Sequence, residues 1–189
     1  NLFYVRFLSL SFGVASVAVF FYLAKKLFRR EVALCISTLS YALFFGIPLL
    51  EGNIANAENF MHLPILLAFY FLLSKDKKNR DFYSILAGVL LSSAFLFKIV
   101  AIFDFLAASV ILFVFRYFNE PFLDFGLIFR RASLAKTSKL ILKYLLTFLK
   151  TEGRFIIAFI VPIILSLLYF FLNGALGDYY KAFKTLNVM

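Results

Sequence analysis

Long apolar runs separated by short basic segments constrain the fold of this chain more than any other feature. Four runs hold at most one charged residue each: 2–23, 32–50, 57–73 and 155–172. A fifth run, 84–115, holds two, Lys98 and Asp104. A helix needs about 20 apolar residues to cross a bilayer, so this run is too long for one such helix and too short for two. We therefore predict an all-α polytopic transmembrane helical bundle of about six membrane helices, with two short helices turning near 98–104.

The composition excludes a soluble domain. Hydrophobic residues make up 63% of the 189 residues, and the formal net charge is +10. In a soluble protein this charge would suggest nucleic-acid binding, but here the basic residues lie between apolar runs, where cytoplasmic retention and lipid headgroups account for them. Cys35 is the single cysteine and lies in mid-span, which excludes an intrachain disulfide and argues against a Cys-based metal site. Membrane lipids, and no nucleic acid, are the expected partners.

The distribution of basic residues predicts the orientation in the cell membrane. The segments 25–31, 75–81 and 116–154 hold 16 of the 20 Lys and Arg residues. By the positive-inside rule these segments are cytoplasmic, and both ends of the chain are external. An external first residue, Asn1 rather than Met, suggests a fragment of a longer protein. We treat residues 1–189 as a single transmembrane domain of that protein.

The cytoplasmic segment 116–154 contains an amphipathic pattern. On a helical wheel, four lysines fall within an arc of about 60°: Lys136, Lys139, Lys143 and Lys150. Apolar residues occupy the opposite arc: Leu134, Ile141, Leu142, Tyr144, Leu145, Phe148 and Leu149. This pattern predicts one interfacial helix lying on the cytoplasmic leaflet.

The densest group of polar residues between two apolar runs is the stretch from Glu51 to Pro64. It includes Glu51, Asn56, Glu58 and His62, and it contains no Lys or Arg. A charge buried in hydrocarbon costs roughly 2.5–3.5 kcal/mol or more, so each carboxylate must be solvated, paired or functional. Glu51 fits a solvated loop as well as a site. Glu58 and His62 have i,i+4 spacing and share a helix face if the third span begins before Glu58. One Glu and one His are too few for a metal site, and a structural Glu–His pair is the favoured explanation of this spacing.

Lys98 interrupts a sequence in which apolar residues alone would serve packing. A lysine there needs an anion, which is either a protein carboxylate, Asp104 or Glu58, or a phosphate. The alternative is a lysine that reaches from a helix end to water. Arg6, early in the first span, is open to the same two interpretations. The orientation predicts that Arg6, Glu58 and Lys98 all lie at the external face.

Four short segments carry a family resemblance: Arg6–Gly13, Leu23–Phe28, Asn56–Phe60 and Leu86–Lys98. Over about residues 3–115 the chain resembles the membrane-embedded C-type glycosyltransferases, in the branch of protein O-mannosyltransferases and aminoarabinose transferases. The resemblance implies a polyprenyl-phosphate-linked sugar donor and transfer of the sugar to an acceptor at the external membrane face.

The resemblance also implies roles for individual residues. Glu58 becomes the catalytic carboxylate on the acceptor side, Lys98 a ligand of the donor phosphate, and Arg6 a weaker one. Further substrate-binding candidates are Glu51, Asn56 and His62. The catalytic aspartate of the family lies in a loop before the first span, where this sequence has no matching residue, so the chain by itself is expected to be inactive. No metal ligand set is indicated, and no cofactor follows from the sequence.

Two other classes of function remain open from the residues alone. A secondary transporter or lipid flippase also carries ionisable residues in membrane segments, but usually near the midplane on broken helices. A non-catalytic membrane assembly protein would need no acidic and basic cluster at one interface. The predicted grouping of charges at one face favours the glycosyltransferase.

Overall fold

The computed structural model describes residues 2–46, 57–74, 76, 78–117 and 134–188. In this part of the chain all regular structure is helical, so the predicted all-α class is confirmed there. The elements are α1 (Leu2–Leu27), α2 (Glu31–Gly46), α3 (Ala57–Leu72), α4 (Arg80–Phe97), the 3₁₀ turn η2 (Ile99–Ala101), α5 (Ile102–Tyr117), α7 (Leu134–Leu172) and α8 (Leu176–Val188).

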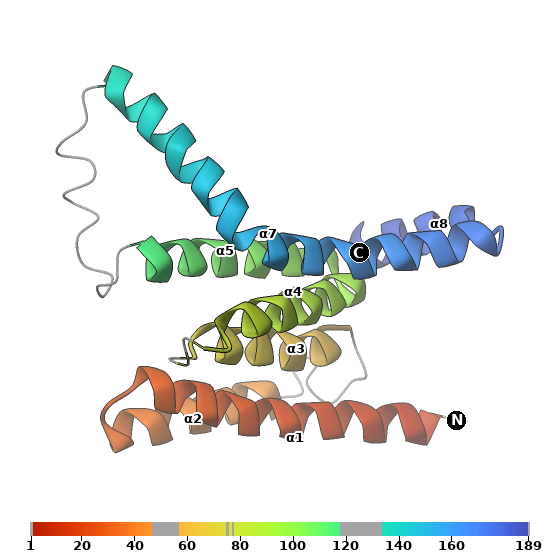
Figure 1. Ribbon diagram of the computed structural model, residues 1–189. Helices are drawn as coiled ribbons and strands as arrows, with labels where there is room; N and C mark the ends of the chain where they lie inside the picture. The colour runs from red at the N-terminus through yellow and green to blue at the C-terminus, as the bar shows by residue number, and fades with distance from the viewer. Residues whose placement is uncertain (1, 47–56, 75, 77, 118–133, 189) are drawn as a thin grey trace.

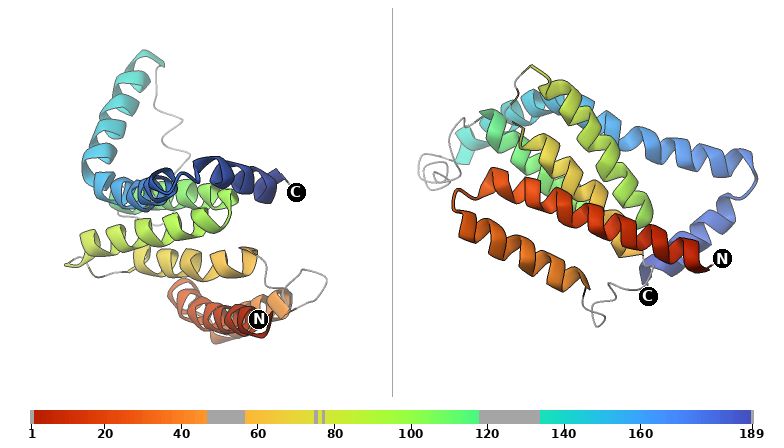
Figure 2. Two further views of the ribbon diagram at one scale, coloured as in Figure 1. Left: turned by 90° about the vertical axis from the view of Figure 1, so that its right-hand side faces the viewer. Right: turned by 90° about the horizontal axis from the view of Figure 1, so that it is seen from below.

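The helices stack in layers and alternate in direction (Figure 1). α1 and α2 form one layer, α3 packs on α1, α4 packs on α3, and α7 packs on α4 beside α5. The basic turns after α1 and before α4 lie at one end of the bundle, while η2 and the turn between α7 and α8 lie at the other end. The two views in Figure 2 show α8 leaving the end of α7 and turning back across this second end.

Within the described ranges, three helical segments are long and apolar enough to cross a membrane: Phe3–Leu27, Arg80–Phe97 and Glu152–Leu172. Three shorter apolar helices accompany them: Glu31–Gly46, Ala57–Leu72 and Ile99–Leu112. The two helices expected within 84–115 are present as α4 and α5, joined through η2. The total of six membrane helices stays a prediction, because the shorter helices fall below the length of a full span.

The structure corrects the prediction for residues 134–172. The sequence suggested an interfacial helix at 136–150 and a separate span from Phe155, but α7 is one continuous helix over this range. Its single glycine at the junction, Gly153, costs about 1 kcal/mol relative to alanine and does not end a helix. Figure 1 shows the first part of α7 pointing away from the bundle and the second part packed on it. The interfacial location of the first part stays a prediction.

Small residues let α4 and α7 approach closely. A Cβ added at Gly88 of α4 would lie 2.5 Å from the Phe155 carbonyl oxygen and 2.9 Å from Ala158 Cβ of α7. Without a hydrophobic driving force between helices in lipid, such close contact is a main source of association. The buried cluster around this contact is made of Ile65, Ala68, Ala87, Leu91, Ala94, Ala101, Ala108, Leu112, Phe155 and Phe159.

The turns at the two ends follow local side-chain chemistry. After α7, Gly174 has φ of 67°, and the N–H groups of Gly174 and Ala175 donate to the carbonyls of Phe171 and Phe170 at 3.1 and 2.9 Å, as in a Schellman motif. Before α4, the Asp76 carboxylate accepts two hydrogen bonds: one from the Asn79 side chain at 2.7 Å and one from the Lys78 backbone N–H at 3.0 Å. These hydrogen bonds, with that from Asn79 the strongest, lower the pKa of the Asp76 carboxyl.

The alternation of the helices predicts which turns are accessible from outside a cell. A cysteine placed at Asn79, in a Cys35→Ala background, should resist a membrane-impermeant maleimide in intact cells and react after permeabilisation, because the positive-inside rule predicts that the basic turns are cytoplasmic. A cysteine at Asn173, in the turn at the opposite end, is the matched control and should react in intact cells. Labelling of the Asn79 position from outside would overturn the orientation.

The contact at Gly88 predicts an unequal response to two glycine substitutions. Gly88→Ala should destabilise the protein by about 1–3 kcal/mol, because backbone atoms of α7 must move to admit the methyl group. Gly153→Ala is the control, since a Cβ there meets no atom within 4 Å. It should leave stability unchanged or raise it by up to about 1 kcal/mol. Thermal unfolding of the purified variants measures both, and equal midpoints for the two would contradict the packing described here.

Candidate functional site

The first turn of α3 carries the carboxylate that the sequence singled out. α3 begins at Ala57, so Glu58 lies in its first turn, where the helix dipole favours a negative charge. The next residue, Asn59, is buried against the bundle. Because the helix starts before Glu58, His62 shares its face at i,i+4 spacing, as the sequence predicted.

Lys98 lies where α4 ends and η2 begins. Its backbone is extended, with φ of −154° and ψ of 130°. Its N–H still donates to the Ala94 carbonyl at 3.0 Å, and its own carbonyl accepts from the Ala101 N–H at 3.1 Å. The chain therefore leaves one helix and enters the next within a single residue, and that residue carries the cation.

Lys98 and Glu58 form an ion pair between α4 and α3. The Lys98 Nζ donates to Glu58 Oε1, and the side chains are 28% and 34% exposed. The predicted approach of these two residues is confirmed. Of the two carboxylates that the sequence offered as partners of Lys98, the structure selects Glu58.

The second oxygen of the same carboxylate makes no hydrogen bond within the part of the chain that the structure describes. Glu58 Oε2 is buried and has no hydrogen-bond partner among the described residues. A carboxylate can accept several hydrogen bonds, and a buried acceptor left without one costs about 1–3 kcal/mol. Among the described residues, the Lys98 ammonium is thus paired with one oxygen of the carboxylate, and the other oxygen can accept a hydrogen bond from a ligand.

His62 and Asp104 lie beside the pair on neighbouring helices. The His62 ring meets the Phe45 ring of α2 edge to face, with centroids 5.8 Å apart. Asp104 lies in the first turn of α5. Two helices and one junction therefore bring titratable groups to one end of the bundle. These are α3 with Glu58 and His62, α5 with Asp104, and the α4–η2 junction with Lys98.

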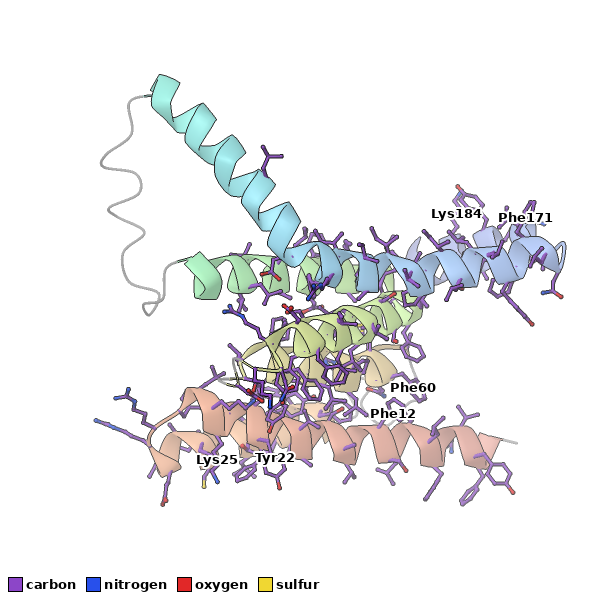
Figure 3. All side chains as sticks on the ribbon, viewed as in Figure 1. Phe12, Tyr22, Lys25, Phe60, Phe171 and Lys184 are labelled. Carbon is purple, nitrogen blue, oxygen red and sulfur yellow. The ribbon has the colours of Figure 1, made fainter. Side chains whose placement is uncertain are left out.

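An aromatic row flanks the ion pair, and sequence reasoning missed it. The Phe60 ring of α3 lies 5.3 Å from the Phe12 ring of α1 and 5.9 Å from the Phe97 ring at the end of α4. Figure 3 shows Phe12 and Phe60 facing each other between the two layers. Because the chain has 28 Phe, the residue type alone does not indicate which of them lie beside the ion pair. The available signal is sequence position, since Phe60 and Phe97 lie within two positions of Glu58 and Lys98.

Of the remaining predicted site residues, the structure describes Arg6, and it shows no contact between Arg6 and the pair. Arg6 lies near the start of α1 and is exposed. The N-terminal end of α1 lies at the same end of the bundle as η2 (Figure 1). Glu51 and Asn56 lie outside the described residues. Within the described ranges no group of three or more His, Cys, Asp or Glu residues could hold a metal ion.

Charge pairs at the opposite end have a different character. Arg154 of α7 pairs with Asp81 of α4, and these side chains are 64% and 55% exposed. Exposed pairs contribute about 0–1 kcal/mol, so this one adds little to stability. Lys26 of α1 donates to the Tyr70 carbonyl at 2.7 Å and lies 3.4 Å from the centroid of its ring, which ties α1 to α3 near the basic turns. The Glu58–Lys98 pair is the better shielded of these carboxylate pairs.

The fold and the site together define a class: an all-α bundle with membrane-spanning helices and an acidic and basic cluster at one end. Comparison with known families makes the class specific. Residues 1–149 match the family described as dolichyl-phosphate-mannose-protein mannosyltransferase, and the chain belongs to this family. The predicted membership among membrane-embedded C-type glycosyltransferases is thereby confirmed, over a longer range than the short segments suggested. No curated protein and no solved structure matches the chain.

Family membership fixes the coarse outline of function. It implies a glycosyltransferase that depends on a sugar carried by dolichyl or another polyprenyl phosphate. The donor of such an enzyme has an anionic phosphate at the membrane interface, attached to a long apolar chain. The Glu58–Lys98 pair lies at the end of helices that are apolar along most of their length.

Proposed function

We propose that the chain forms the donor-phosphate and acceptor region of a polyprenyl-phosphate-sugar-dependent glycosyltransferase that acts at the external membrane face. The observation that carries the proposal is the Glu58–Lys98 pair at the end of the bundle opposite the basic turns. The positive-inside rule assigns that end to the external side. The match to the mannosyltransferase family supports the class of donor.

Lys98 is the proposed ligand of the donor phosphate. An ammonium at the interface is a point charge that several phosphate oxygens can share, and its partial exposure leaves it accessible. As the sugar leaves the phosphate, negative charge accumulates on the phosphate oxygens. A fixed cation stabilises that charge strongly where water is partly excluded. Arg6 is a proposed second cation at the same end, on the exposed first turns of α1.

Glu58 is the proposed carboxylate on the acceptor side. Its Oε2 has no protein partner among the described residues, so it can accept a hydrogen bond from an acceptor hydroxyl. Such a contact orients the attacking oxygen and raises its electron density as the new bond forms. His62, one turn along α3, is a proposed positioning residue. Glu51 and Asn56 stay sequence-based candidates for substrate binding.

Substitution of Lys98 should weaken donor binding. A charge-assisted contact is worth roughly 1.5–3 kcal/mol, so Lys98→Ala should lower the affinity for a polyprenyl-phosphate sugar by about tenfold to a hundredfold. Lys98→Arg should recover part of the loss, because it restores the charge but not the geometry of an ammonium. Binding of the donor to the purified protein in lipid nanodiscs is the measurement.

Lys184→Ala is the control for the Lys98 substitutions. Lys184 is an exposed lysine of α8 at the same end of the bundle, so its loss changes net charge without touching the pair. If Lys98→Ala binds the donor as well as the parent does, Lys98 is only a helix-end lysine in contact with water, and the proposal fails.

Substitution of Glu58 should act on turnover instead. Glu58→Gln keeps the size of the side chain and removes its negative charge, so sugar transfer in the natural protein should fall by at least about tenfold while donor binding is not weakened. The reason is that a carboxylate facing the acceptor contributes mainly in the transition state. Single-turnover transfer measured with saturating donor separates the two effects. Unchanged turnover in Glu58→Gln would remove Glu58 from the chemistry.

A further inference from the structure

The Glu58 carboxylate occupies the position next to the Lys98 ammonium that an anionic ligand of Lys98 would need. Its Oε1 accepts from the Lys98 Nζ, and the pair joins residues 40 positions apart in the chain. A second anion brought to the same ammonium would lie within a few ångströms of the carboxylate. Like charges at that distance repel, so a phosphate and Glu58 cannot share Lys98 without a cost.

The resting pair is also incompletely satisfied. Only one of the two Glu58 oxygens has a partner among the described residues, and the other is buried. Movement of the carboxylate away from Lys98 therefore breaks one hydrogen bond. After this movement both oxygens can accept hydrogen bonds from other donors. His62 offers a nearby alternative, because i,i+4 residues on a helix lie side by side and an imidazole N–H can donate.

We propose that Glu58 is an internal competitor for the anion subsite of Lys98, and that an anionic headgroup must displace it to bind. This inference rests on the proposed function and adds a rule of selection to it. A neutral lipid cannot replace a carboxylate on an ammonium, so only an anionic lipid opens the site. The same displacement frees Glu58 to accept a hydrogen bond from the hydroxyl of the acceptor. Binding of the donor therefore also makes Glu58 available to orient the acceptor.

Competition predicts that removing the competitor tightens binding. Farnesyl phosphate is the probe, and farnesol is its neutral counterpart. In nanodiscs of neutral lipid, Glu58→Gln should bind farnesyl phosphate about threefold to tenfold more tightly than the parent, the range expected for loss of a partly exposed ion pair. Glu58→Asp keeps the charge on a shorter side chain and should fall between the parent and Glu58→Gln. Farnesol binding should be the same in all three proteins.

Two controls separate competition from a general change of charge. Asp104→Asn removes a neighbouring negative charge that is not paired with Lys98, and it should change farnesyl phosphate affinity by less than about twofold. In a Lys98→Ala background, Glu58→Gln should no longer tighten binding. If Asp104→Asn tightens binding as much as Glu58→Gln does, competition for Lys98 is refuted.

The outcomes also distinguish this inference from the proposed function. If Lys98→Ala leaves farnesyl phosphate binding unchanged, the phosphate subsite itself is wrong and both proposals fail. If Lys98→Ala weakens binding but Glu58→Gln does not tighten it, the subsite stands and the displacement is refuted. Should Glu58→Gln fail to fold, Glu58→Asp decides the question, because equal affinity of this variant and the parent would also contradict the competition.

Discussion

The ion pair between Glu58 and Lys98 sets the chemistry of one end of this bundle. A lone lysine among the apolar residues around position 98 would be costly, and so would a lone carboxylate at the start of α3. Together the two charges satisfy each other and join α3 to the α4–η2 junction. The other carboxylate oxygen has no hydrogen-bond partner in the described ranges, and this is the basis of the ligand site proposed above.

The pair depends on rigid support from the rest of the bundle. α4 packs between α3 and α7, and the absence of a side chain at Gly88 lets α7 contact α4 at backbone distance. Close packing of this kind holds the end of α4, and with it Lys98, in a fixed position relative to α3. Phe60, between Phe12 and Phe97, adds a layer of rings beside the pair. Precise placement of charge at the interface thus rests on small residues in the interior.

Sequence reasoning reached the class and offered Glu58 as one of the two carboxylates for Lys98, because both have a strong physical signal. Runs of apolar residues require helices in lipid, and Lys98 required an anion. It placed a boundary near Phe155 wrongly, since hydropathy changes there while the backbone has no reason to stop at Gly153. It also missed the buried Glu152 of α7 and the Phe60 row, because burial and ring contacts depend on which helices become neighbours. The sequence offered both Asp104 and Glu58 as partners of Lys98, and the fold pairs Lys98 with Glu58 because α3 and the end of α4 become neighbours.

An experimental structure of the protein in nanodiscs with farnesyl phosphate bound tests the central claim most directly. The account predicts phosphate density in contact with the Lys98 ammonium, with the Glu58 carboxylate moved off that ammonium toward His62. It also predicts that the helices keep their present packing around Gly88. Phosphate bound at another place, or bound while Glu58 still holds Lys98 as it does here, would contradict the account.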